Sequence, residues 1–414
     1  MKKFLALALA LVMALSLAAC GKKADDNNKG NGDEAKGSVY YLNFKPEADK
    51  AWQDLAKTYT EKTGVEVKVV TAASGQYDTM LTSELDKSAP PTMFQVGNQG
   101  AVNSYGDFCY PLDNTDVMKE MTTQDFNLKN ANGETVSIGY CYEAYGIIVN
   151  KALLKQAGYE ITDITNFESL KKVADDIHAR ANELGFDAFS SAGLEGSSSW
   201  RFSGHLANMP LFYEFRDDNV TAQPATIKGT YLDNYKAIWD LYTTDSATTG
   251  AALTTATGDT SEAEFGQGKA VFFQNGSWEY ANLTGEEKAG LCCGTENCWA
   301  VNKNASEADI KATLDFMNWV VTSDAGTTML AEQFGPCPFK NAKTPENVFF
   351  AQANEYVANG NYTVTWAFNW TPAVDDWRAA VVDALGKYTA DGGSWDTVKT
   401  AFVEGWATQY ANEH

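Results

Sequence analysis

The sequence has little histidine and lacks the short motifs that mark the common classes of enzyme. Its 414 residues include three histidines, His178, His205 and His414. It contains no G-x-S-x-G nucleophile elbow, no H-E-x-x-H zinc motif, no phosphate-binding P-loop and no G-x-G-x-x-G after an expected strand. Scattered Asp and Glu residues could form a glycosidase pair, but no spacing singles out two of them. The sequence therefore indicates no particular enzymatic chemistry.

Positive charge is also scarce. Lys and Arg number 32 against 54 Asp and Glu, which gives a formal net charge of −22. This excess argues against nucleic acid as a partner and against direct adhesion to an anionic membrane surface, because both carry negative charge themselves. After residue 19, no stretch without charges is both long enough and apolar enough for a membrane-spanning helix. The acidity mainly favours solubility.

The cysteines do not follow a metal-binding pattern. Zinc sites usually pair cysteines two to four residues apart and add further matched ligands, and that spacing is absent. We therefore expect no metal and no cofactor. Export would permit disulfides, but adjacent cysteines cannot join each other without straining the peptide bond between them. We expect these six to be largely free: Cys109, Cys141, Cys292, Cys293, Cys298 and Cys337.

The first residues predict export from the cytoplasm. Met1, Lys2 and Lys3 precede an apolar segment that extends from Phe4 to Ala19. Two lysines, an apolar segment too short to span a bilayer and small residues before a break are typical of a secretory signal peptide. We expect residues 1–19 to be this signal peptide.

A single cysteine stands where the apolar segment ends. Leu17-Ala18-Ala19-Cys20 resembles the lipobox of bacterial lipoproteins, in which the cysteine is acylated and becomes the first mature residue. Residues 21–37 contain no large apolar side chain, so they cannot offset the entropy lost on folding. We expect residues 20–37 to be a lipidated cysteine and a flexible tether on the outer side of the bacterial cell membrane. The alternative is an ordinary cleavage site beside an unrelated cysteine.

The order of expected elements after the tether predicts an α/β fold. Residues 39–42 have the pattern of a short strand, residues 48–59 place apolar side chains on one helical face, and residues 65–70 alternate as a strand. Strand, helix and strand in this short space form a βαβ unit, which implies parallel pairing. Residues 38–414 are too many for one compact core, so we expect two domains.

Later segments repeat the same pattern. Ile147–Val149 reads as a buried strand, and two helices are expected behind the capping patterns Thr165-x-x-Glu168 and Ser306-x-x-Asp309. His178 lies beside the apolar stripe of the first of these helices, which makes it a surface residue and not a ligand. The C-terminal part of the chain looks mainly helical. The predicted class is α/β with helical additions.

Aromatic residues are abundant, with eleven Trp and nineteen Tyr. Trp200 stands among serines in "SSSWRFSGHL", Trp278 follows a Gly-Ser turn in "NGSWEY", and "TWAFNWTPAVDDWR" contains Trp366, Trp370 and Trp377. Indole rings stack on the C–H faces of sugars while nearby carboxylates and amides bind the hydroxyls. The alternative for each Trp is ordinary packing in a core.

These stretches belong to a series of motifs that resembles a known family. The others are "VYYLNFKPEADKAWQDLAKTYTEKTGVEV", "YEAYGIIVNKALLKQAG", "FGQGKAVFFQNGSW" and "VNKNASEADIKATLDFMNWVVTSDAGTTML" with "PFKN" after it. In this order behind a lipobox, they resemble the extracellular solute-binding lipoproteins of carbohydrate ABC transporters, the maltose-binding-protein-like group. The resemblance extends over essentially all of the chain after the tether.

The resemblance implies a two-lobed fold of the periplasmic-binding-protein type II, in which each lobe is a β-sheet flanked by helices and the ligand lies in the cleft between them. Lobe 1 would comprise residues 38–144 plus 297–345. Lobe 2 would comprise residues 145–296 plus 346–414. The implied protein is a monomer that needs no cofactor and works with the permease subunits of an ABC transporter.

The resemblance also assigns the ligand-binding residues. Lobe 1 would contribute the loop after the first strand, the end of the "MFQVGNQG" strand and the segment before the first crossing, and lobe 2 would contribute stacking aromatics. At least two of Trp200, Trp278 and Trp377 should line the sugar site. The full set is Lys45, Glu47, Asn98, Gln99, Glu143, Tyr145, Trp200, Trp278, Trp370 and Trp377.

Two features depart from the family pattern. Asn98 stands where the family often has an acidic residue, so the preferred ligand cannot be copied from a relative. The segment between Trp278 and the crossing back to lobe 1 is short and lacks the usual proline.

The function implied is that of a membrane-tethered receptor that captures a sugar or oligosaccharide by hinge closure and delivers it to an ABC permease for import. Such a receptor is not an enzyme. Two alternatives stay open from the residues. One is a receptor of the same fold for a peptide, a polyamine or a metal chelate. The other is an anchored glycan hydrolase.

Overall fold

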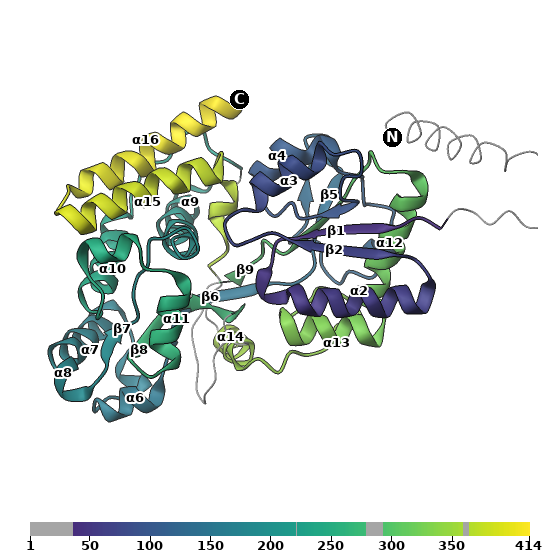
Figure 1. Ribbon diagram of the computed structural model, residues 1–414. Coiled ribbons are helices and arrows are strands. Elements are labelled where there is room, and N and C mark those ends of the chain that lie inside the picture. The colour runs from purple at the N-terminus through teal and green to yellow at the C-terminus, as the bar shows by residue number, and fades with distance from the viewer. Residues whose placement is uncertain (1–35, 221, 279–292, 359–363) are drawn as a thin grey trace, which may run out of the picture. The chain divides into compact units, whose positions relative to one another are not determined.

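The computed structural model describes residues 36–220, 222–278, 293–358 and 364–414. The expected signal peptide, the tether with Cys20 and the segment directly after Trp278 lie outside the described residues. Among those described, the strands form two separate sheets, and each sheet has its own helices (Figure 1).

The first sheet has six strands in the order β2-β1-β3-β10-β5-β4. β1 pairs in parallel with β2 and β3, whereas β10 returns from much later in the chain and pairs antiparallel with β3 and β5. The strands are β1 (Val39–Asn43), β2 (Val67–Thr71), β3 (Met93–Phe94), β4 (Leu128–Lys129), β5 (Thr135–Gly139) and β10 (Cys298–Val301).

Helices cover both faces of the first sheet. Successive side chains of a strand point to opposite faces, and so Tyr41 packs with Trp52 of α2 while Leu42 packs with Leu81 of α3. In Figure 1, α2 and α13 lie on one side of the sheet and α3 and α4 on the other. The helices are α2 (Asp49–Thr63), α3 (Tyr77–Leu85), α4 (Gln99–Tyr105), α5 (Asp116–Lys119), α12 (Glu307–Thr322) and α13 (Asp324–Gln333).

The second sheet has four strands in the order β7-β8-β6-β9, with β6 and β8 antiparallel in the middle. The strands are β6 (Glu143–Val149), β7 (Asp187–Phe189), β8 (Ala270–Gly276) and β9 (Cys293–Gly294). Its helices include a π-helical segment, η4 (Arg201–Leu206), and a short 3₁₀ segment, η7 (Ala367–Trp370). The α-helices are α6 (Lys151–Gln156), α7 (Phe167–Ala179), α8 (Ala181–Leu184), α9 (Asn208–Asp218), α10 (Leu232–Thr244), α11 (Gly258–Gly266), α14 (Val348–Ala358), α15 (Val374–Asp391) and α16 (Trp395–Glu413).

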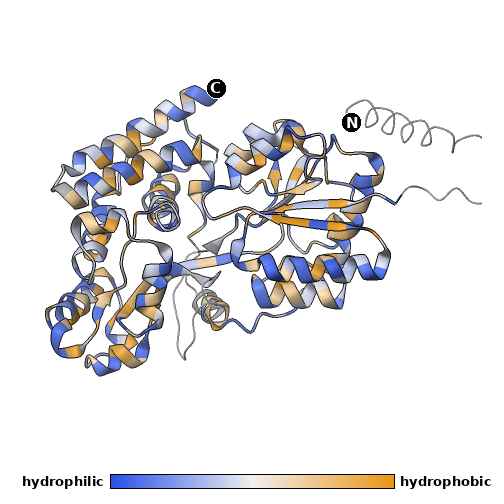
Figure 2. Cartoon of the chain, in the orientation of Figure 1, coloured by the Kyte–Doolittle hydropathy of each residue, from blue (hydrophilic) through white to orange (hydrophobic). Residues whose placement is uncertain are grey.

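Each sheet has its own hydrophobic core. Trp52 and Trp299 lie in the core of the first sheet, and Phe202, Trp239 and Trp406 lie in that of the second. Hydrophobic residues accordingly concentrate on the strands and on the inner faces of the helices (Figure 2). The α/β class predicted from the sequence is confirmed. The exact lobe boundaries stay a prediction, although the strands of the second sheet all fall between residues 143 and 294.

The local signals read from the sequence are partly confirmed. β1, α2 and β2 form the expected βαβ unit with parallel pairing, and Ser306 caps α12 by accepting a hydrogen bond from the Asp309 N–H at 3.1 Å. The capping pattern assigned to Thr165 is wrong by one residue. Asn166 caps α7, because its side chain accepts from the Ser169 N–H at 2.9 Å while the Ser169 hydroxyl accepts from the Asn166 N–H at 3.0 Å.

Candidate ligand-binding site

Lys45 and Glu143 form an ion pair that links the two sheets. Lys45 lies in the loop after β1, and Glu143 is the first residue of β6. The Lys45 Nζ lies 2.8 Å from a Glu143 carboxylate oxygen and 3.5 Å from one of Glu47. Burial alone would lower the pKa of Lys45, but the two carboxylates outweigh it and raise that pKa above its ordinary value. The lysine therefore stays charged beside a Glu143 side chain that is 5% exposed.

Aromatic rings from the second sheet lie against this ion pair. Trp278 follows β8, and the Lys45 ammonium lies 5.5 Å from the centroid of its ring. The Trp200 ring is 5.5 Å from that of Trp278, and the Tyr145 ring is 6.3 Å from it. A cation above an indole face is attracted by the ring. The structure thus brings together six of the predicted site residues: Lys45, Glu47, Glu143, Tyr145, Trp200 and Trp278.

The Trp278 ring is held by its own strand end. Its Nε1–H donates to Asn275 Oδ1 at 2.8 Å. The ring also packs on Gly276, where a Cβ would come within 2.2 Å of ring atoms. A glycine is therefore required at the end of β8 for the indole to lie flat there. The Gly-Ser turn noted in the sequence has this physical role.

The Trp200 ring is positioned by the π-helical segment that follows it. Arg201 is 1% exposed, and its guanidinium donates to Gln274 O and Ser261 Oγ, each at 3.1 Å. These bonds fasten η4 to β8 and α11. Trp200 Nε1–H donates to Ser197 O at 3.1 Å, which fixes the indole itself. Single π-helical turns occur frequently at functional sites.

His205 lies at the centre of the aromatic rings and was not identified from the sequence. Its side chain is 3% exposed, and its ring lies 4.8–5.3 Å from those of Tyr145, Trp200, Trp278 and Trp366. Burial lowers the pKa of His205 well below 6.5, and the positive charges of Arg378 and Lys45 add to this effect. The imidazole is therefore neutral. Its position in the same stretch as Trp200 was the only signal available, and a lone histidine in an apolar stretch more often packs in a core.

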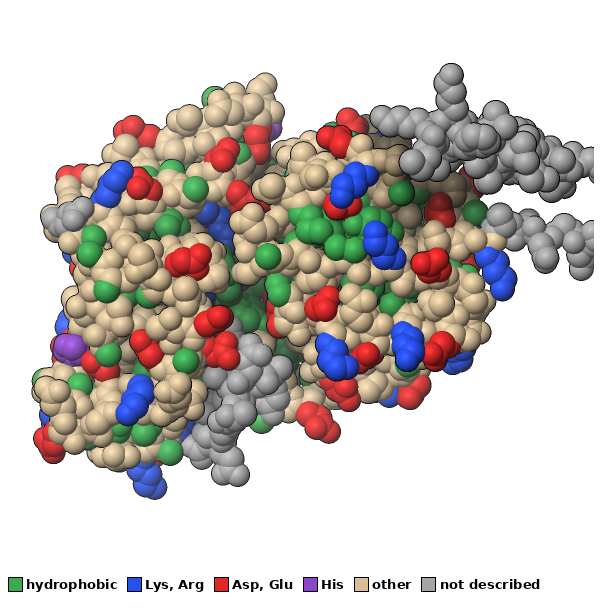
Figure 3. Space-filling model, viewed as in Figure 1, with side chains coloured by type: hydrophobic (Ala, Val, Ile, Leu, Met, Phe, Trp, Pro, Cys, Tyr) green, Lys and Arg blue, Asp and Glu red, His purple; other side chains and the backbone are tan. Residues whose placement is uncertain are grey.

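A cavity of about 970 Å³ lies next to the aromatic rings and is lined from both sheets. Figure 3 shows the molecular surface hollowed where the elements of the two sheets meet, with hydrophobic side chains inside the hollow. Trp366 belongs both to this cavity and to the rings around His205. Two predicted residues, Gln99 and Trp370, line it as well. Asn98 is the N-cap of α4, where its side chain accepts from the Ala101 N–H at 2.8 Å.

The structure does not bring Trp377 together with the other predicted rings. Trp377 is 1% exposed, its Nε1–H donates to Phe402 O at 2.9 Å, and its ring contacts Phe402 and Trp406. The reason is helical geometry: Trp377 lies on the face of α15 that packs on α16. The next residue, Arg378, lies on another face and approaches η4, since a Cβ on Gly204 would come within 2.8 Å of its guanidinium.

Four charged residues near the ion pair were not identified from the sequence. Glu296 interacts with Lys45 and Arg378, and burial raises its pKa. Burial and the neighbouring Asp375 carboxyl raise the pKa of Asp78 to about 8, although Arg378 opposes this. Asp78 lies on α3 and Asp375 on α15, so the pair also joins elements of the two sheets. No sequence pattern connects these four residues.

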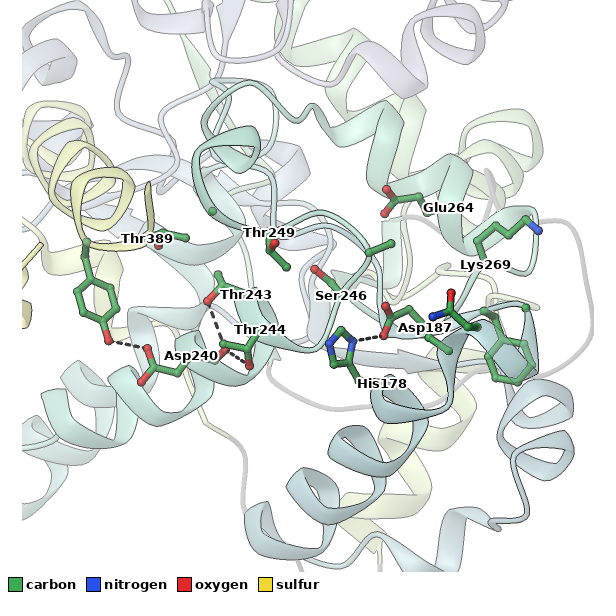
Figure 4. A pocket seen from close by; sticks show the side chains of 17 residues that line it. His178, Asp187, Asp240, Thr243, Thr244, Ser246, Thr249, Glu264, Lys269 and Thr389 are labelled. Carbon is green, nitrogen blue, oxygen red and sulfur yellow. Dashed lines mark hydrogen bonds and ion pairs between the residues drawn. The ribbon is translucent and has the colours of Figure 1, made fainter. Parts of the chain in front are cut away.

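A larger cavity, of about 1200 Å³, lies elsewhere and is lined only by the second sheet and its helices. In Figure 4 the His178 ring points to Asp187, and the Nδ1 atom lies 2.8 Å from Oδ1. Tyr388 donates to Asp240 at 2.8 Å across the same cavity. None of the residues predicted to bind the ligand lines it. His178 is partly exposed on α7, as expected for a surface residue of that helix.

Three observations on the described part of the chain concern membrane helices, metal ions and cysteines. Among the described residues, no helix is long and apolar enough to cross a membrane. Within the same residues, no group of three or more His, Cys, Asp or Glu side chains could hold a metal ion. Cys109, Cys141, Cys298 and Cys337 are free thiols, whereas Cys292 and the side chain of Cys293 lie outside what the structure describes.

The structure has two β-sheets, each with its own helices and core, and charged and aromatic side chains from both meet at one place. These features define a two-domain binding protein of the α/β class. Residues 54–358 match the family of bacterial extracellular solute-binding proteins. The chain belongs to this family, because the match includes more than half of its residues.

Known proteins of similar sequence and structure agree with this assignment. Over 160 residues the chain is 29% identical to the diacetylchitobiose binding protein DasA of Streptomyces coelicolor, a match that spans 37% of this chain and only 36% of the relative. RafE of Streptococcus pneumoniae in complex with raffinose has a TM-score of 0.70 and 16% identity over 90% of this chain and 99% of its own. A solute-binding protein from Thermotoga lettingae bound with α-D-tagatose has a TM-score of 0.69 and 14% identity over 91% and 100%. The two structures share the fold of this chain.

Proposed function

We propose that the protein is a receptor that captures a carbohydrate outside the cytoplasm and delivers it to an ABC permease. Family membership supports the role of a solute receptor, and the relatives named above are a diacetylchitobiose binding protein and two proteins in complex with raffinose or α-D-tagatose. The observation that carries the proposal is the contact of the Lys45–Glu143 ion pair with the Trp278 ring. A sugar needs both polar partners for its hydroxyls and an apolar surface for its C–H face.

Each group has a distinct task in this proposal. Glu143 accepts hydrogen bonds from sugar hydroxyls, and Lys45 holds the carboxylate in place while donating its remaining protons. Trp200 and Trp278 stack against the ring of the sugar. Because Lys45 comes from the first sheet and the two tryptophans from the second, a bound sugar contacts both lobes and stabilises the closed arrangement.

The structure offers one argument for the non-sugar alternative. Glu47, Glu143 and Glu296 all interact with the Lys45 ammonium, which lies over the Trp278 ring. Carboxylates and an aromatic face together are the chemistry that binds a cationic solute such as a polyamine. However, the Lys45 ammonium already occupies this position, 2.8 Å from Glu143 and 5.5 Å from the Trp278 centroid. This ammonium would repel a cationic ligand, whereas it would not repel a neutral sugar.

We further propose that the receptor does not turn over its ligand. Glycosidases use two carboxyl groups on opposite sides of the scissile bond, whereas Glu47 and Glu143 share one lysine. Acylation of Cys20 would keep the protein at the membrane, beside the permease. We expect it to act there as a monomer.

Calorimetry with a panel of neutral oligosaccharides and with spermidine tests the proposal, and chromatography of the recovered ligand follows. We expect saturable binding of at least one carbohydrate, no binding of spermidine and no cleavage products. Binding of spermidine alone would favour the cation receptor, and cleavage products would favour the hydrolase.

A further inference from the structure

We infer that closure of the two lobes takes up one proton, which Asp78 and Asp375 share where the lobes meet, so that the receptor closes more readily as the pH falls. This inference rests on the proposed function, because it concerns the closure that holds the ligand. Asp78 lies on α3 and Asp375 on α15, which accompany different sheets. Their carboxyl groups are hydrogen-bonded to each other.

The two aspartates lie in a region where elements of the two sheets touch. A Cβ on Gly75, just before α3, would lie 3.4 Å from Gly196 O in the loop before η4. A Cβ on Gly100 of α4 would lie 3.6 Å from Thr371 O, in the segment between η7 and α15. Opening of the cleft would separate these elements. The contact between the two carboxyl groups is therefore a feature of the closed arrangement.

A hydrogen bond between two carboxyl groups requires a proton. Ionised carboxylates have only acceptor atoms, so two of them cannot bond to each other directly. Their like charges also favour the protonated form of one partner when they are brought together. A single proton held between Asp78 and Asp375 provides the missing donor and removes the repulsion.

The surrounding charges do not replace this proton. Arg378 acts on both carboxyl groups and lies 4.0 Å from that of Asp375, but Glu296 adds a third carboxyl group to the cluster. One guanidinium compensates one carboxylate, so an excess of negative charge is left. Two phenols also face the pair, Tyr77 on α3 and Tyr105 on α4, and burial raises the pKa of both. These phenols are therefore neutral near pH 7.

Separation of the lobes would release the proton. Each aspartate lies in the first turn of its own helix, where the helix dipole favours a negative charge. Once apart and hydrated, both should ionise above the ordinary pKa near 3.8, whereas burial and the Asp375 carboxyl raise the pKa of Asp78 to about 8 in the closed arrangement. The contribution of the proton to closure is thus complete at low pH and is lost as the pH rises from about 4 to about 8.

Calorimetry in two buffers with different enthalpies of ionisation measures the protons taken up with the ligand. The probes are maltotriose, N,N′,N″-triacetylchitotriose and raffinose. At pH 6.5, we expect binding of a probe to take up about one proton, because the pair is ionised in the open receptor and shares a proton in the closed one. Between pH 5.5 and pH 8, the affinity should fall about tenfold or more, since one proton changes it by up to about tenfold per pH unit.

Variants assign the proton to this pair. Asp78→Asn cannot take up a proton, although its amide can still donate to the Asp375 carboxylate, so it should bind the probe without proton uptake. Asp376→Asn, an exposed position beside Asp375, removes one negative charge from the same helix and should keep the uptake. If Asp78→Asn does not fold, Asp375→Asn removes the other half of the pair and is held to the same result.

A second measurement needs no ligand. Small-angle X-ray scattering of the ligand-free protein should give a smaller radius of gyration at pH 5.5 than at pH 8, because protonation favours the closed arrangement. Asp78→Asn should give the same radius at both pH values. This measurement decides the inference even if none of the three probes binds.

The outcomes separate the inference from the proposed function. Binding without proton uptake, or uptake that persists in Asp78→Asn and disappears in Glu296→Gln, would overturn the shared proton while leaving a sugar receptor intact. A radius of gyration that does not change with pH in the unmodified protein would overturn it as well. Failure of every carbohydrate to bind, together with a radius that changes as expected, would instead count against the sugar as ligand and leave the proton-linked closure standing.

Discussion

The Lys45 ammonium lies 2.8 Å from the Glu143 carboxylate, although 98 residues separate the two in the chain. This contact joins the loop after β1 to the strand that begins the second sheet. Both side chains are largely buried, so the pair needs mutual compensation of charge. It places a fixed carboxylate and a fixed ammonium beside the aromatic rings of the proposed sugar site.

Replacement of Glu143 by Gln should weaken ligand binding about tenfold to a hundredfold, because a charge-assisted hydrogen bond in a desolvated site contributes about 1.5–3 kcal/mol. Calorimetry with the ligand found in the screen measures the effect. Glu61→Gln, at an exposed position of α2, is the matched control and should bind normally. Since the change also removes a carboxylate charge that compensates Lys45, the melting temperature must be measured alongside. Affinity that falls only in step with the melting temperature would show a structural role alone.

Tryptophan replacements should divide into two kinds. Trp200→Ala and Trp278→Ala remove half-buried rings of the proposed site and should weaken binding by about 1–3 kcal/mol with modest effects on folding. Trp377→Ala removes a ring that is 1% exposed between α15 and α16, and should lower the free energy of unfolding by about 3–5 kcal/mol. Denaturant unfolding and calorimetry on the three variants distinguish the two kinds. A large loss of affinity with normal stability in Trp377→Ala would contradict the role seen here.

The carboxyl groups of Asp78 and Asp375 should make stability depend on pH. Burial and Asp375 raise the pKa of Asp78 to about 8 in the folded protein, with Glu296 adding to the shift and Arg378 opposing it. The folded state therefore holds a proton that the unfolded chain has lost above its ordinary pKa near 3.8. It follows that this group lowers the free energy of unfolding as pH rises from about 4 to about 8.

Melting temperatures at pH 5, 7 and 9 check this dependence. Asp78→Asn cannot ionise, so the variant should lose less stability between pH 5 and pH 9 than the unmodified protein. Asp376→Asn, on the same helix as Asp375, controls for the loss of one negative charge near the site. Identical pH profiles for Asp78→Asn and the unmodified protein would exclude the proposed coupling.

Cys20→Ala should release the protein from the membrane while leaving export intact, since residues 21–37 contain no large apolar side chain to insert. Cell fractionation with a salt wash, followed by immunoblotting, measures the distribution. A variant that stays with the washed membranes would disprove anchoring through this cysteine. The unmodified protein should resist the same wash.

Several properties of the chain could be predicted from local sequence. The βαβ unit of β1, α2 and β2 follows from the spacing of apolar residues, and its helix ends at Gly64, whose φ of 72° favours glycine. Trp200 and Trp278 could be selected because each stands beside small residues at the end of an element. Lys45 and Glu143 came from the family resemblance, and the structure places them in contact.

Other features were decided only by the tertiary structure. Glu296, Arg378, Asp78 and Asp375 come from four segments, and an ion pair or a shared proton between distant segments leaves no local pattern. Trp377 and Arg378 are neighbours in the sequence, yet successive residues of a helix point in directions about 100° apart. One is therefore buried against α16 while the other approaches η4. Sequence alone determined which elements form and which residue types are available, whereas the packing of two sheets and their helices decided which side chains meet at the site.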